Sequence, residues 1–118
     1  MAGRRHLTDA EATASLRRGR QVEQLLLADG AEVHWVTLWT SGQVNLHRVE
    51  DLGHAEFRDV AEFPPLDQDE HVGEGIEVAR CDTFAESIEA AKGVGCQADR
   101  WVNSGMVGDD YADARGFR

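Results

Sequence analysis

The chain has 118 residues, of which 42% are apolar and 29% charged, and its formal net charge is −10. This size and composition are typical of one folded domain and exclude a disordered chain. No apolar run approaches the roughly 18 residues of a membrane-spanning helix, and the N-terminus lacks the apolar core of a secretory signal. We therefore expect one soluble domain over residues 1–118, located in the cytoplasm. Cys81 and Cys96 are then expected as reduced thiols, although one disulfide is the alternative.

The charge is unevenly spread along the chain. Residues 1–20 hold five arginines against two acids, which gives +3, so the other residues carry −13. Such an acidic body repels phosphate backbones, and we expect no nucleic-acid binding outside the N-terminal arm. It favours basic protein partners.

The first element expected is a long helix. Residues 1–7 are interpreted as a frayed lead, and the sequence from Thr8 to Glu11 is a capping box. Apolar and small residues then recur at helical spacing, which predicts a helix to about Ala28. Gly19 either breaks this helix or allows it to pack closely on a sheet.

A hairpin is expected over Glu32–Glu50. If Ser41-Gly42 is a two-residue turn, Trp35 lies opposite Arg48. Both Trp35 and Trp39 then share a face, which we expect against the helices because large aromatic side chains gain most from burial. A register slip of one residue would re-pair the faces.

The rest of the chain alternates short elements. Residues 55–63 favour a third strand with a bulge, although their apolar spacing of three is also typical of a helix. A loop over 66–75 precedes a strand at 76–81, and Asp82 or Thr83 is expected to cap a second helix that ends near Gly93. The tail, 96–118, is expected to dock irregularly on the core, with a short strand at 100–103 and a short helix at 109–114.

These elements predict an α+β fold. We expect a mostly antiparallel sheet of three to four strands, with the N-terminal helix and the later helix packed on one face.

An acidic stretch follows the hairpin. Seven acids and no lysine or arginine lie between Asp59 and Glu77. Their neutral interpretation is a solvated loop with outward strand positions, whereas a negative surface would dock a basic partner. The candidate partner-binding acids are Asp67, Asp69, Glu70 and Glu74. A calcium loop of the EF-hand type starting at Asp67 fails, because Val72 and Val78 replace its required glycine and glutamate.

Trp101 and Tyr111 are unusual residues for a C-terminal tail. They either dock the tail on the core or anchor a partner, since these residue types carry much of the binding energy at interface centres.

His34 and His47 share one face of the hairpin in the expected register. This pair is the alternative ligand or metal site, although zinc would require further ligands, and a small enzyme could use the pair in acid–base chemistry. The nucleophile-elbow and dinucleotide motifs are absent, and we expect no cofactor and no resident metal.

The sequence contains no motif that identifies a family. The leading hypothesis is a non-enzymatic acidic binding protein, an inhibitor or immunity-type protein that neutralises a basic partner such as a nuclease toxin. A small enzyme or ligand-binding module at His34 and His47 is the alternative. A third hypothesis is a homo-oligomer that associates through an open sheet edge.

Overall fold

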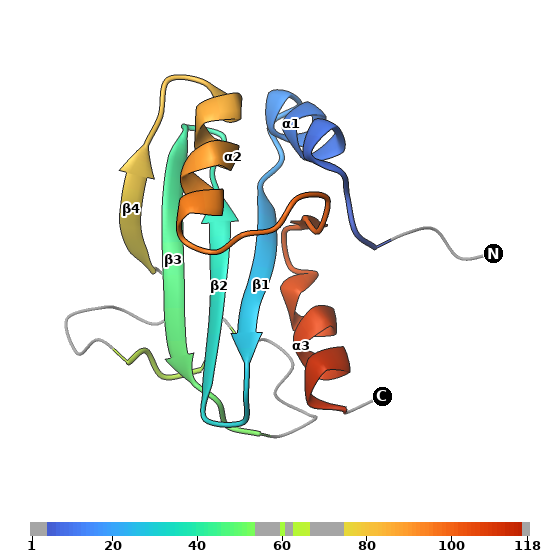
Figure 1. The fold of residues 1–118 in the computed structure, drawn as a ribbon, viewed down its shortest axis with the longest axis vertical. Helices are drawn as coiled ribbons and strands as arrows, with labels where there is room; N and C mark the ends of the chain where they lie inside the picture. The colour runs from blue at the N-terminus through green and yellow to red at the C-terminus, as the bar shows by residue number, and fades with distance from the viewer. Residues whose placement is uncertain (1–4, 54–59, 61–62, 67–74, 117–118) are drawn as a thin grey trace.

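The computed structural model describes residues 5–53, 60, 63–66 and 75–116. In these residues the chain forms a five-stranded antiparallel sheet and three helices (Figure 1), which confirms the α+β prediction with one strand more than expected. The strand order across the sheet is β4-β3-β2-β1-β5. The elements are α1 (Asp9–Arg17), β1 (Val22–Ala28), β2 (Glu32–Leu38), β3 (Gln43–Glu50), β4 (Ile76–Arg80), α2 (Phe84–Gly93), β5 (Val102–Asn103) and α3 (Val107–Arg115).

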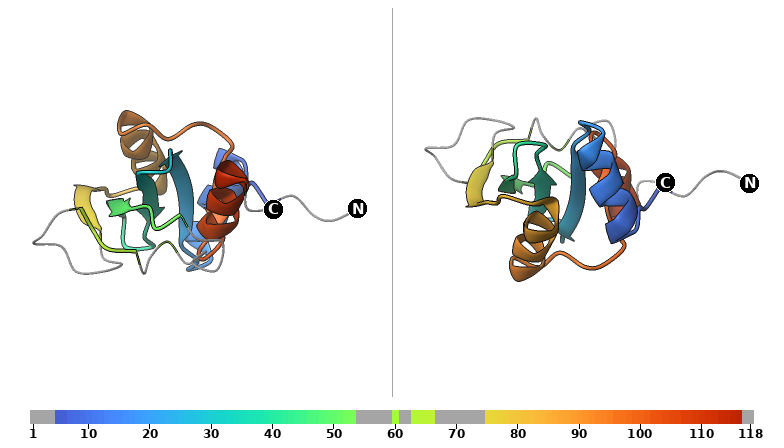
Figure 2. Two further views of the ribbon diagram at one scale, coloured as in Figure 1. Left: turned by 90° about the horizontal axis from the view of Figure 1, so that it is seen from below. Right: turned by 90° about the horizontal axis from the view of Figure 1, so that it is seen from above.

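The core has two parts, one on each face of the sheet. The first face packs against α1 and α2. This part of the core includes Val36 and Leu38 of the sheet and Ile88 of α2. The second face packs against α3, and its buried residues include Trp35 and Tyr111. Figure 2 shows α2 standing on one side of the sheet, and both it and Figure 1 show α3 beside the β1 edge. The two helices expected from the sequence therefore share a face, and the tail supplies a third helix elsewhere.

The prediction of one helix to Ala28 is wrong beyond Arg17. The capping box at Thr8 is present, since the Thr8 hydroxyl accepts from the Glu11 amide and the Glu11 carboxylate accepts from the Thr8 amide. Gly19 then adopts a φ of +82°, a left-handed conformation that ends the helix. The chain continues as β1, so the first alternative for Gly19, a helix break, is the correct one.

Loss of the capping box is expected to have a modest effect on stability. Thr8→Ala removes the acceptor for an N-terminal amide of α1, so the free energy of unfolding should fall by about 1 kcal/mol. Urea unfolding followed by tryptophan fluorescence measures the change. Thr40→Ala, at an exposed position in the hairpin loop, is the matched control. Equal stabilities of the two variants would show that the box does not stabilise the fold.

The hairpin forms, but its register differs by one residue from the prediction. The loop has three residues, because the Trp39 amide donates to the Gln43 carbonyl at 2.9 Å and Gly42 adopts a φ of +91°. Trp35 consequently lies opposite His47 rather than Arg48. Trp35 therefore faces α3 on the second face, and the expectation that it packs against the two predicted helices is wrong.

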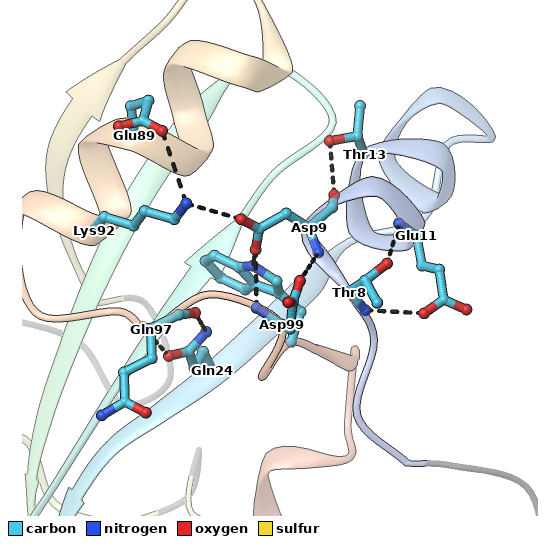
Figure 3. A network of polar contacts seen from close by, with 10 residues as sticks. Thr8, Asp9, Glu11, Thr13, Gln24, Glu89, Lys92, Gln97 and Asp99 are labelled. Atoms are coloured by element: carbon cyan, nitrogen blue, oxygen red, sulfur yellow. Dashed lines mark hydrogen bonds and ion pairs between the residues drawn. The ribbon is translucent and has the colours of Figure 1, made fainter.

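The tail docks on the core through a polar network around Asp9 (Figure 3). Its carboxylate accepts from the Lys92 ammonium at 2.8 Å, from Trp101 Nε1 at 2.9 Å and from the Asp99 amide at 3.1 Å. Burial alone would raise the pKa of Asp9, but these three hydrogen bonds outweigh it and lower the pKa. Asp9 thus joins α1, α2 and the segment before β5. The tail also contains the expected short strand and short helix, as β5 and α3.

Residues at the N-terminal end of the described chain also contact the core. The Leu7 amide donates to the Trp101 carbonyl at 2.6 Å, and His6 Nε2 lies 3.0 Å from the Asp110 carboxylate on α3. The frayed lead expected over residues 1–7 therefore does not extend to residues 5–7. Among the described residues, no helix has both the length and the apolar character needed to cross a membrane.

Candidate functional site

The four candidate acids, Asp67, Asp69, Glu70 and Glu74, lie outside the described residues, as does most of the predicted strand at 55–63. The residues that flank the acids are described. The Leu66 amide donates to the Arg48 carbonyl at 3.0 Å, and Ile76 pairs with Leu46. Leu66 and Ile76 therefore lie beside the same short stretch of β3.

The nearest described acid adds little to this charge. Glu77, on β4, lies 2.7 Å from the guanidinium of Arg80 on the same strand. Both side chains are well exposed, so the pair is weak but locally neutral. A negative field at this edge would arise mainly from the segment 67–74.

The two aromatic residues proposed as anchors belong to the core. Trp101 and Tyr111 are both 0% exposed. Trp101 donates to Asp9, and the Tyr111 hydroxyl donates to Asp51 at 2.7 Å. A partner could reach neither ring without unfolding the tail, so the docking interpretation is correct and the anchor interpretation is not.

The structure separates the two histidines of the alternative site. His34 lies opposite Arg48, whereas His47 lies opposite Trp35, so the histidines point to opposite faces of the sheet. His34 Nε2 lies 2.8 Å from the carboxylate of Glu32. The predicted pair does not exist, because the one-residue change in register moves His47 to the other face.

His47 lies buried against Trp35. The two rings are stacked, with centroids 4.5 Å apart and planes within 3° of each other. The imidazole Nε2 lies 3.0 Å from the hydroxyl of Thr37. Burial lowers the pKa of His47 from 6.5 to about 4. The ring is therefore neutral at physiological pH, and it acts as a packing and hydrogen-bonding group.

Gly75 completes the environment of His47. A Cβ atom added at Gly75 would lie 2.8 Å from the imidazole ring, and Gly75 has a φ of +72°. The residue that ends the acidic segment thus packs directly on the buried histidine. Substitution of Gly75 would disturb both the backbone conformation at this position and the packing of the His47 ring.

The structure also contains a buried polar row that the sequence did not reveal. Glu23, Thr37 and Asn45 are neighbours across β1, β2 and β3, and all three are buried on the second face. The Glu23 carboxylate accepts from the Gly105 amide at 2.6 Å and lies 3.5 Å from the Thr37 hydroxyl. The row joins the sheet to the turn before α3. Alternate polar residues in β2 and β3 were the available signal, but they resemble a solvent-facing pattern.

The described residues offer no site for a metal ion and no reactive thiol at Cys96. Among the described residues, no group of three histidines, cysteines or acids could hold a metal ion. Cys81 and Cys96 are both free, as expected for reduced thiols. Burial raises the pKa of Cys96 to about 12, so this residue is a core thiol and not a nucleophile.

No protein family matches the chain, and no curated protein sequence or solved structure matches it either. The class defined so far is an α+β domain with a five-stranded antiparallel sheet. Its function has to be argued from its own charges and surfaces.

Proposed function

We propose that the chain is a non-enzymatic acidic protein that binds a basic protein partner through the segment 67–74. The proposal is supported mainly by charge, because the net charge is −10 and four of the eight residues in this segment are acids. The flanking residues, Leu66 and Gly75, both lie beside β3. Charges at such a place raise the association rate and select the partner.

A basic protein fits this surface better than a nucleic acid or a metal does. Phosphate backbones are repelled by the negative body, and Val72 and Val78 replace two residues that a calcium loop of the EF-hand type requires. The most specific version of the proposal is an inhibitor or immunity-type protein that covers the basic active site of a nuclease. In that version, the partner's own cationic groups for phosphate would meet the acids of the segment.

Removal of charge in the segment is expected to weaken binding of the partner. The partner would be captured from an extract of the native host on the immobilised protein, then purified and titrated. Asp69→Asn combined with Glu70→Gln should raise Kd about tenfold, and Kd should also rise steeply with salt because the attraction is screened within about 10 Å at 0.1 M.

The matched control changes the same charge elsewhere. Asp82→Asn combined with Glu89→Gln alters two exposed acids next to and on α2, which β4 separates from the segment. This variant should keep Kd within about twofold of the unchanged protein. A partner whose affinity ignores salt, or responds equally to both double variants, would refute the proposal. Nuclease activity that persists in the saturated complex would refute the inhibitor version alone.

A further inference from the structure

The edge of β1 is only partly covered by another strand. Beyond β1 the described sheet contains only β5, which pairs with Val22 and Glu23 alone. Continuing this register would place Arg100 opposite Leu25. The chain diverges before this point, because Trp101 pairs with Leu7 instead. In the part of the chain that the structure describes, no strand covers the outer edge of Gln24–Ala28.

Backbone groups on this edge point outward. The Ser104 amide donates to the Gln21 carbonyl at 3.3 Å, so the backbone groups of Gln21 point toward β5. Backbone direction alternates along a strand, which places the N–H and C=O groups of Glu23 and Leu25 on the same side. Glu23 is opposite β5, whereas Leu25 lies beyond the last paired residue. Leu25 therefore offers a donor and an acceptor for another strand.

Two adjoining hollows lie along this edge, with volumes of about 350 and 280 Å³. Leu25, Arg100 and Ala114 line both of them. The second hollow is also lined by the whole run from Gln24 to Ala28 and by Gln97, which is held by reciprocal hydrogen bonds with Gln24 at 2.6 and 3.0 Å. In Figure 1, α3 lies beside β1 on this side. We call this place the β1 groove.

We propose that the β1 groove binds an extended segment of a partner protein by strand addition. The run Gln24–Ala28 spans about 16 Å at roughly 3.3 Å per residue, which suits about five residues of an extended chain. Main-chain hydrogen bonds to Leu25 would provide affinity, and the adjoining hollows would accept alternate side chains. The exposed side of Leu27 and the half-buried Leu25 and Leu26 give the groove apolar walls.

The positive charge of Arg100 selects the residue type at one position of the bound segment. Arg100 is exposed and makes none of the ion pairs found among the described residues. The acids of the first hollow, Asp110 and Asp113, are instead paired with Arg5. A carboxylate of the bound segment would thus meet Arg100 without competition. The occupant is an extended, apolar peptide with an aspartate or glutamate at the position facing Arg100.

This proposal does not rest on the acidic segment, which is attached to β3 at the opposite side of the sheet. The tests of the two surfaces remain separate, because Asp69→Asn combined with Glu70→Gln should not change binding in the β1 groove.

The test uses a phage-displayed library of random peptides of about nine residues, selected on the full chain. Enriched peptides should carry an acid at a fixed distance from apolar residues. Ala114 lines both hollows, so Ala114→Trp places an indole ring in the groove and should weaken a selected synthetic peptide at least about tenfold, as should Arg100→Glu. Ala85→Trp, on the exposed face of α2, and Arg17→Glu are the matched controls, which should bind within about twofold.

Hydrogen exchange provides a readout that does not depend on the variants. Binding should slow exchange of the Leu25 amide at least about tenfold, because the bound strand would accept its proton. Failure to select any peptide, equal affinity for Ala114→Trp and Ala85→Trp, or unchanged exchange at Leu25 would each overturn the proposal. A peptide that binds as a helix would give the last result.

Discussion

Replacement of Asp51 by alanine is expected to lower the free energy of unfolding by about 3 kcal/mol. The side chain of Asp51 is 0% exposed and lies 2.8 Å from Arg115 Nε. It also accepts from the Tyr111 hydroxyl at 2.7 Å and from the Gly53 amide at 2.7 Å. Its removal deletes the common acceptor that joins the residue after β3 to α3, and the half-buried Arg115 loses this buried ion-pair partner. Urea unfolding at pH 7, extrapolated linearly to water, measures the change.

Two further variants distinguish the effect of losing the buried Asp51 carboxylate from the effect of any change in the contacts of α3. Asp113→Ala removes an ion-paired aspartate on α3, the helix that carries Tyr111 and Arg115. Because the side chain of Asp113 is 43% exposed, the free energy of unfolding should fall by at most about 1 kcal/mol. Tyr111→Phe keeps the ring and removes one hydrogen bond to Asp51, which should cost about 1 kcal/mol. An effect of Asp51→Ala no larger than that of Asp113→Ala would show that this carboxylate does not hold the tail.

Local signals in the sequence predicted several elements correctly. Thr8 and Thr83 both cap helices, and the alternation at 76–81 is a strand. Each of these signals acts within one turn or one strand, where hydrogen bonding to the neighbouring backbone decides the structure. The expected α+β class followed from the order of such elements.

The errors arose where packing across the chain decides the structure. The helical spacing of apolar residues continued from Leu16 through Val22 to Leu26, but Val22 and Leu26 lie in the strand β1. A spacing of four residues places two side chains on one face of a strand as well as on one face of a helix, so Val22 and Leu26 pack in the same core cluster as Leu16. In the hairpin, a third loop residue changed every cross-strand pair, because side chains alternate with a period of two.

The candidate site could not be predicted because it depends on contacts between residues that are far apart in the sequence. Trp101 meets Asp9, and Tyr111 meets Asp51, across separations of 92 and 60 residues. Both aromatic rings are buried and each donates to an acid that is distant in the sequence, which removes the rings from the candidate surface. The β1 groove arose in the same way, because the pairing of Leu7 with Trp101 draws the chain away from β1.

The stability of the fold is expected to depend on the protonation of His47. Burial lowers the pKa of this residue from 6.5 to about 4 in the folded state. Between these values the unfolded chain binds a proton that the folded chain does not bind, so stability falls as the pH falls. One pKa unit corresponds to about 1.4 kcal/mol, so the contribution should be about 2 kcal/mol between pH 6.5 and 5, and about 3 kcal/mol by pH 4. Above pH 6.5 the ring is neutral in both states and the effect disappears.

The pH dependence can be assigned to His47 because the chain provides a matched variant. His47→Phe keeps a ring against Trp35 and removes the titrating group, so its stability should lose the slope between pH 6.5 and 5. His34→Phe removes a histidine from the first face and should keep the slope. Urea unfolding at intervals across this range measures both, and the ring proton resonances of His47 should titrate with a midpoint near pH 4 in the folded protein. A midpoint near 6.5 would mean that water reaches the stacked ring, and the stability of His47→Phe would then follow the same pH curve as the unchanged protein.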